Sequence, residues 1–152
     1  MSVLGKLATA LNRRDEVPNQ ELARRIVREN DAAAVKELVE NLHHKDKGIQ
    51  GDCIKALYEI GAANPDLIGK YYREFGKLIE SKHNRLVWGA MIALDAISAK
   101  EPKGIHGMLS KILKVADISG SVIARDHAVG ILVKLGALSS DRKSTRLNSS
   151  HT

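Results

Sequence analysis

One pattern of apolar residues recurs three times along this chain, and it restricts the possible folds more than any other feature of the sequence. The first copy lies between Asp46 and Gly61, and the other two follow at shifts of 37 and 38 positions. In each copy the apolar or small residues have the spacing of one face of an α-helix. They are Ile49, Cys53, Ala56, Leu57 and Ile60; Leu86, Ala90, Ala93, Leu94 and Ile97; and Ala124, Ala128, Ile131, Leu132 and Leu135. A repeat of this period predicts one supersecondary unit that is used several times.

A further stretch with helical apolar spacing precedes each copy, at residues 35–42, 72–79 and 105–113. Pro65 and Pro102 stand between the resulting helix pairs, where a proline suits the first turn of a helix and ends the element before it. An aromatic content of only 3% agrees with close helix packing rather than with a sheet. We therefore predict an all-α fold, an α-solenoid of about three helix pairs over 31–64, 65–101 and 102–138.

The first thirty residues are less regular than the rest. Val3, Leu4, Leu7 and Leu11 have the spacing of one short amphipathic helix, and residues 18–28 that of another. Terminal repeats of a solenoid need a cover for their open apolar edge. We interpret residues 1–30 as an N-terminal helical cap.

The second helix of each pair resembles the HEAT-repeat pattern Asp-x-x-Val-Arg-x-x-Ala-x-x-Ala-Leu-x-x-Ile-Gly, a pattern of armadillo-like α-solenoid proteins. The first copy retains Asp46, Ile49, Ala56, Leu57, Ile60 and Gly61; the second Ala90, Ala93, Leu94 and Ile97; the third Arg125, Ala128, Leu132, Leu135 and Gly136. Gln50 replaces the pattern's Arg in the first copy, and His83 replaces its Asp in the second. Because no copy carries both the Asp and the Arg, the polar ladder between repeats that is typical of the family is not expected in its usual form.

The apolar periodicity stops at Ser139, and the polar residues that follow predict a disordered tail over 139–152. Residues 141–151 also resemble the in-frame translation of a common sequencing-library adapter. We interpret the tail as an artefact without functional residues, and we expect the natural protein to diverge from this chain near Ser140. The alternative is a natural polar tail.

The charge and cysteine content narrow the choice of partners and of compartment. The formal net charge is +6, and it falls to +4 when Asp141, Arg142, Lys143 and Arg146 of the tail are left out. The single cysteine, Cys53, permits no intrachain disulfide, and we predict it to be a buried core residue. No apolar run approaches the length of a membrane span, so we predict a cytoplasmic protein that does not enter the membrane.

The resemblance implies that second helices line the concave surface of the solenoid, and this surface holds our candidate binding residues. On these helices, equivalent positions outside the buried apolar face would lie side by side in neighbouring repeats and form rows across the surface. Aromatic and charged residues in these rows suit a protein or peptide partner. The candidates are Lys55, Tyr58, Trp88, Asp95 and Asp126. The alternative is that Trp88 packs between repeats and Tyr58 covers its neighbours.

The sequence contains no glycine-rich phosphate loop, metalloprotease motif or nucleophile elbow. We therefore predict a protein without enzymatic activity or cofactor, an interaction scaffold. His43, His44 and His83 in the turns within pairs could be metal ligands, although turn histidines are usually only exposed. Lys45, Lys47, Lys82 and Arg85 make the same edge basic, which leaves nucleic acid as an alternative partner. Another alternative is the regulatory N-terminal part of a larger enzyme, truncated near residue 140.

Overall fold

The computed structural model describes the backbone of residues 2–151 and the side chains of residues 2–118 and 120–136. Within these limits the chain forms eight α-helices and no β-strand. The α-helices are α1 (Val17–Glu29), α2 (Ala32–Glu40), α3 (Lys47–Ala63), α4 (Tyr72–Leu78), α5 (Asn84–Ile97), α6 (Pro102–Gly107), α7 (Leu109–Ser119) and α8 (Val122–His151). Short 3-10 segments are η1 (Leu4–Lys6), η2 (Asn41–His43), η3 (Pro65–Leu67) and η4 (Gly69–Tyr71). The predicted all-α class is confirmed.

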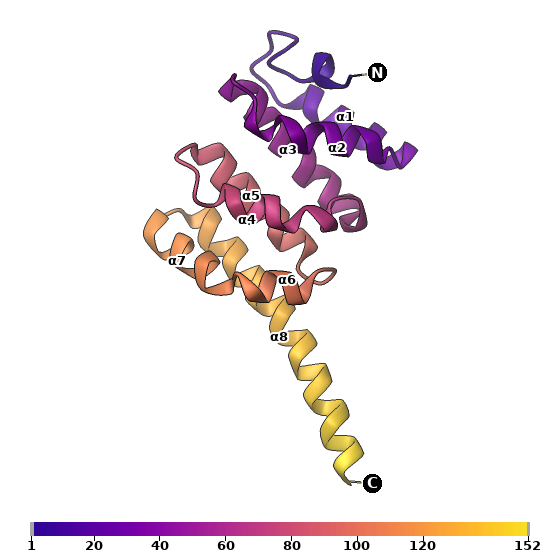
Figure 1. The fold of residues 1–152 in the computed structure, drawn as a ribbon, viewed down its shortest axis with the longest axis vertical. Helices are drawn as coiled ribbons and strands as arrows, with labels where there is room; N and C mark the ends of the chain where they lie inside the picture. The colour runs from indigo at the N-terminus through magenta and orange to yellow at the C-terminus, as the bar shows by residue number, and fades with distance from the viewer. Residues whose placement is uncertain (1, 152) are drawn as a thin grey trace.

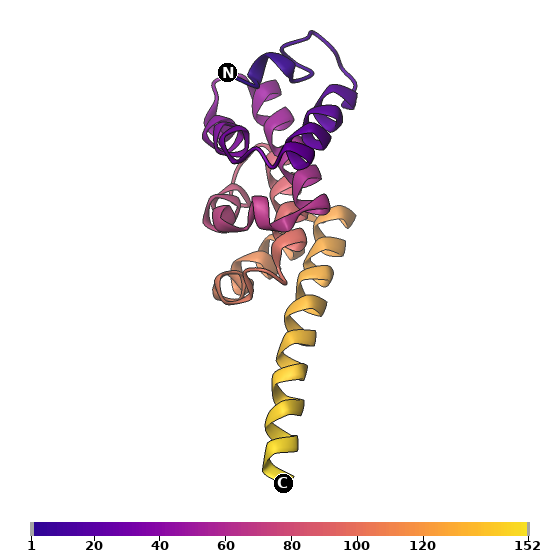
Figure 2. The same cartoon turned by 90° about the vertical axis from the view of Figure 1, so that its right-hand side faces the viewer.

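The helices lie in layers that follow one another along the long axis of the molecule (Figure 1). In the view of Figure 2, α2, α4 and the α6–α7 segment form one column on the left. A second set of helices packs in series, since α3 contacts both α1 and α5, and α5 also contacts α8. The helix α1 therefore packs on α3 in the same way that α3 packs on α5, as the next member of the same series.

The predicted second helices agree with α3, α5 and the first part of α8. The start of α3 has a local cause, because Asp46 Oδ1 accepts a hydrogen bond from the Gly48 amide at 2.7 Å. This contact satisfies a backbone donor that the first turn of a helix leaves free. Asp31 has the same role at α2, where its Oδ1 accepts from the Ala34 amide at 3.1 Å.

The predicted helix through Val3 and Leu11 is wrong, because this segment contains only the 3-10 turn η1. The amides of Ala8 and Thr9 donate to the side chains of Asn19 and Asp52 rather than to carbonyls one turn earlier. These contacts replace the hydrogen bonds that would extend a helix. The apolar side chains are nevertheless used, since Val3 and Leu7 are buried in the core.

The first helix of the predicted third pair is divided into two. The helix α6 ends at Gly107, Met108 has a non-helical backbone, and α7 begins at Leu109. Gly104 and Gly107 both lie in this short segment, and glycine is among the weakest helix formers. The apolar positions still face inward, because Ile105 and Ile112 are both 0% exposed.

The core extends along the inner faces of α3 and α5, and it includes Cys53 as predicted. Cys53 is 0% exposed, and burial raises the pKa of its thiol to about 12. Met91 of α5 is also 0% exposed, whereas Val129, 38 positions later in α8, is 57% exposed. The face of α5 that carries Met91 is covered by packed helices, and the corresponding face of α8 is open.

The backbone of α8 continues as a helix to His151, where the sequence suggested a disordered tail from residue 139. The side chains of 137–152 lie outside the described residues. The interpretation of 141–151 as translated adapter sequence therefore stays a prediction. In the described part of the chain, no helix has both the length and the apolar character that crossing a membrane requires.

Replacing Met91 with Ala should lower the free energy of unfolding by about 3 kcal/mol, because the cavity would lie in a packed core. The matched change Val129→Ala should cost no more than about 0.5 kcal/mol, because that side chain is exposed. Urea denaturation of both variants measures the difference. Equal losses would contradict the packing of α5 against its neighbours.

Candidate functional site

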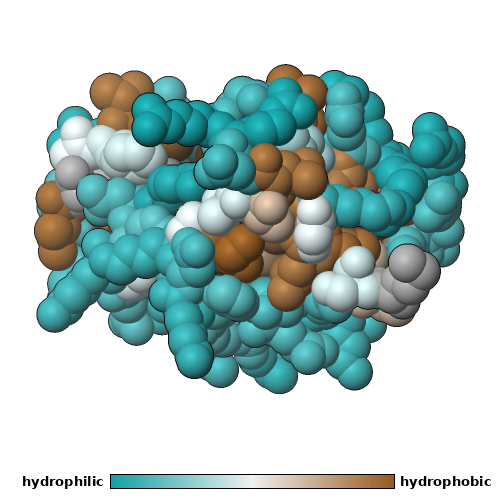
Figure 3. Space-filling view, turned by 90° about the horizontal axis from the view of Figure 1, so that it is seen from above, coloured by the Kyte–Doolittle hydropathy of each residue, from teal (hydrophilic) through white to brown (hydrophobic). Residues whose placement is uncertain are grey.

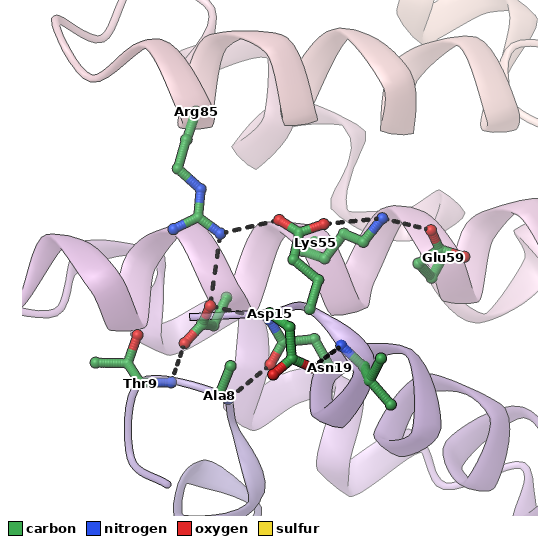
Figure 4. Close-up of polar contacts among 10 residues, drawn as sticks. Ala8, Thr9, Asp15, Asn19, Lys55, Glu59 and Arg85 are labelled. Atoms are coloured by element: carbon green, nitrogen blue, oxygen red, sulfur yellow. Dashed lines mark hydrogen bonds and ion pairs between the residues drawn. The ribbon is translucent and has the colours of Figure 1, made fainter. Parts of the chain in front are cut away.

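A buried carboxylate connects the N-terminal segment to three helices (Figure 4). Asp52 of α3 is 3% exposed and accepts hydrogen bonds from the Thr9 amide at 2.7 Å and from Asn19 Nδ2 at 2.9 Å. Asn19 of α1 is itself fully buried, and its Oδ1 accepts from the Ala8 amide at 2.9 Å. Burying a carboxylate is costly unless its oxygens are hydrogen-bonded, and here both are.

The same carboxylate begins a chain of alternating charges. Arg85 Nη2 of α5 lies 3.5 Å from Asp52 Oδ1 and 3.4 Å from Glu16 Oε1. Glu16 Oε2 lies 3.3 Å from Lys55 Nζ, which donates to Glu59 Oε1 at 2.8 Å. Figure 4 shows Arg85 extending from its helix toward this row. The chain of charges joins the N-cap residue of α1 to α3 and α5, with each cation between two carboxylates.

Lys55 is held as a cation by its surroundings. Burial lowers the pKa of the Lys55 ammonium, but the contacts with Glu59, Tyr58 and Glu16 outweigh this effect and raise it above its ordinary value. The ammonium also lies 4.8 Å from the centre of the Tyr58 ring, within the range of a cation–π contact. Lys55 therefore remains charged throughout the physiological pH range.

A depression of about 250 Å³ lies beside this chain of charges and spans α3, α5 and the start of α8. Its apolar lining comes from Ile54, Tyr58, Trp88, Ile92 and Ile123, and its charged lining from Glu16, Lys55 and Arg85. Ile123 is 43% exposed, whereas Ile54 at the base is 1% exposed. The site therefore offers apolar and aromatic surface next to charges that are already paired.

The structure brings three of the five predicted site residues together in this depression, namely Lys55, Tyr58 and Trp88. Asp95 does not line it. Asp95 Oδ2 instead lies 2.7 Å from His127 Nδ1, and Asp95 Oδ1 accepts from Lys134 Nζ at 2.6 Å, which connects α5 to α8. Asp126 is exposed and also lies outside the lining.

Sequence reasoning missed the residues that organise the site, above all Glu16, Asn19 and Asp52. Asp52 had a detectable signal, because it is a charged residue between Gly51 and Cys53 in a helix that is otherwise mostly apolar. Glu16 had none, since it precedes α1 and its partners lie 39 and 69 positions further along the chain.

The edge formed by the turns has its own polar contact between layers. His83 Nδ1 lies 3.1 Å from Gln50 Oε1, and these are the positions where the HEAT pattern has Asp and Arg. His44 Nδ1 accepts from the Asp46 amide at 3.0 Å. As for the alternative of a metal site, no group of three or more His, Cys, Asp or Glu side chains has metal-binding geometry in the described part of the chain.

Comparison with protein-family models, with curated proteins and with solved structures gave no match for this chain. The assignment of fold and site therefore depends on the residues and contacts described above.

Replacing Asp52 with Ala should lower the free energy of unfolding by about 3 kcal/mol, because Asn19 and the Thr9 amide would lose their acceptor in a buried site. The control Asp126→Ala removes an exposed carboxylate and should cost less than about 0.5 kcal/mol. Chemical denaturation measures both. A cost for Asp52→Ala no larger than that of the control would contradict the network.

The environment of His83 predicts a loss of stability in mild acid. Burial, together with the positive charges of Arg85 and Lys47, lowers the pKa of His83 from its ordinary value of 6.5. The unfolded chain then binds a proton at this site more readily than the folded chain, so folding stability falls as the pH drops below 6.5 toward the lowered value. Above pH 6.5 the imidazole is mostly neutral in both states, and the effect is absent.

The measurement compares the free energy of unfolding of the wild type and of His83→Gln at pH 8 and pH 5. Glutamine can keep a hydrogen bond to Gln50 without titrating. The wild type should lose more stability on acidification than the variant, and the comparison cancels the contribution of the other histidines. Equal losses would show that His83 titrates normally.

Proposed function

We propose that this chain is a HEAT-like α-solenoid, in which the α2–α3, α4–α5 and α6/α7–α8 segments are the repeating pairs. Two observations support this. The apolar pattern recurs at 37 and 38 positions, and the second helices α3, α5 and α8 pack in series. Gln50 and His83 form a contact between layers at the positions of the pattern's Arg and Asp, which is a substitute for the family's usual polar ladder.

We propose further that the chain is a non-catalytic scaffold that binds a protein or peptide partner in the depression lined by Tyr58 and Trp88. The observation that carries this proposal is the grouping of Tyr58, Trp88, Ile92 and Ile123 around about 250 Å³ of open space. Aromatic residues in a depression are typical anchors of protein interfaces. Because the single cysteine is buried and unpaired, a reducing compartment such as the cytoplasm suits this scaffold.

The position of Trp88 favours binding over a purely structural role. Tyr58 packs against the apolar core, but Trp88 is not among the half-buried residues that do so within the described part of the chain. Trp88 is itself half-buried, and the part of its ring that borders the depression is the surface that a partner could cover. The cations of the site, Lys55 and Arg85, are already paired with Glu59, Glu16 and Asp52, which argues against phosphate as the main ligand here.

Selection of peptides from a random display library on the full chain tests this proposal. Trp88 is the only tryptophan, so its fluorescence reports occupation of the depression directly. Selected peptides should shift this fluorescence, and Trp88→Ala should weaken their binding at least about tenfold, as expected for an interface hot spot. Trp88→Ala should remain folded with a moderately lower melting temperature, because the half-buried side chain lies outside the core cluster.

Tyr71→Ala is the matched control, because this aromatic residue lies on η4 and outside the depression. It should leave peptide binding unchanged. The proposal fails if the selected peptides bind Trp88→Ala as tightly as the wild type. A mixed-sequence oligonucleotide tests the alternative: steep weakening of its binding between 50 and 200 mM salt, with no peptide selected, would favour a nucleic-acid partner.

A further inference from the structure

A second pocket, of about 300 Å³, lies between the N-terminal segment and α1. It shares no lining residue with the depression at Trp88. Leu11, Pro18 and Leu22 supply its apolar wall, and Lys6 and Arg25 are among its charged residues. Figure 3 looks along the long axis from above and shows apolar surface in the middle of the molecule with hydrophilic side chains around it.

Arg25 is the unusual residue of this pocket. Its side chain is only 27% exposed, and the nearest carboxylate oxygen, Glu29 Oε2, lies 4.0 Å from its Nε, beyond hydrogen-bond distance. Among the described side chains, Arg25 Nε is the buried nitrogen that has no hydrogen-bond partner. A buried N–H donor without an acceptor is costly, and the unpaired Nε–H of Arg25 therefore calls for an explanation.

The charges around the pocket indicate the kind of ligand. Arg13 is already neutralised by Asp15, since Arg13 Nη2 and Asp15 Oδ1 lie 2.8 Å apart. Lys6 and Arg25 then face a single carboxylate of the lining, Glu21. Glu29 lies outside the lining and its side chain is 54% exposed, so solvent screens its attraction to Arg25 and the lining keeps an excess of positive charge. A monoanion balances this excess, whereas a doubly charged phosphate would be repelled by Glu21.

The apolar wall is also incompletely covered. Leu11 is 49% exposed, although Leu22 beneath it in the same pocket is 4% exposed. A ligand with an apolar body would remove the Leu11 side chain from water, which is favourable in proportion to the area covered. The pocket volume corresponds to roughly ten water-sized volumes of about 30 Å³ each. It therefore suits a molecule of about ten non-hydrogen atoms.

We propose that this pocket binds a small carboxylate with an apolar body, of about the size of octanoate. The planar guanidinium of Arg25 would receive the carboxylate, a pairing in which two parallel hydrogen bonds can form. The aliphatic part would lie against Leu11 and Leu22. The site is independent of the proposed partner surface, because neither its residues nor its ligand class overlap with it.

The test titrates the full chain with octanoate and follows the Arg25 Nε–H signal by ¹H–¹⁵N NMR. Octanoate should shift this signal saturably, with a dissociation constant on the order of 1 mM for so small a ligand. Octan-1-ol and octylammonium have the same apolar body without the negative charge, and they should leave the signal in place. A shift that never saturates, or one that octan-1-ol reproduces, would overturn the proposal.

A variant adds a second readout. Arg25→Gln should weaken octanoate binding about tenfold or more, because it removes the charged donor. The matched control Arg28→Gln lies on the same helix at an exposed position outside the lining, and it should bind octanoate like the wild type. Unchanged affinity in Arg25→Gln would overturn the proposal. If Arg25→Gln fails to fold, the comparison of octanoate with octan-1-ol on the wild type still decides the question.

Discussion

The buried carboxylate of Asp52 is the contact on which the arrangement of the first helices depends. It receives hydrogen bonds from the N-terminal segment and from α1, and an ion pair from α5, while it belongs to α3 itself. A charge at 3% exposure is stable only if its oxygens are satisfied. Each of these elements is therefore restricted to the few positions that deliver a donor to that point. Apolar packing alone would tolerate sliding between the helices, whereas this network specifies their register.

Room for charged side chains between successive helices is a second feature of this structure. A Cβ atom at Gly51 would collide with the guanidinium of Arg85, and one at Gly130 would lie 2.6 Å from Asp95 Oδ2. Both glycines thus lie where a charged side chain of α5 crosses to a neighbouring helix. The absent side chains allow Arg85 to reach Asp52 on one side, and Asp95 to reach His127 and Lys134 on the other. Helix α5 is therefore connected to α3 through Arg85, which passes over Gly51, and to α8 through Asp95, which passes over Gly130.

The features that were predicted correctly from the sequence all depend on local apolar spacing. Apolar spacing in α3, α5 and α8 is a local property, so the helices and the burial of Cys53 could be inferred from neighbouring residues alone. The N-terminal segment could not be predicted in this way. Its apolar spacing is helical, but the Ala8 and Thr9 amides bond to Asn19 and Asp52, which are 11 and 43 positions away. Long-range polar contacts of this kind override local preference and leave no periodic signal.

Long-range polar contacts also explain why only some of the predicted site residues lie together in the depression. Lys55, Tyr58 and Trp88 lie on facing turns of α3 and α5, and helical spacing places them together. Asp95 also lies on α5, but its carboxylate is held by His127 and Lys134. Aligning equivalent helix positions between repeats does not reveal such side-chain partners. The contacts that fix the helices thus also neutralise the charges around the depression. A partner that enters it would remove few unpaired charges from water, so affinity there would depend mainly on apolar fit to Trp88 and its neighbours.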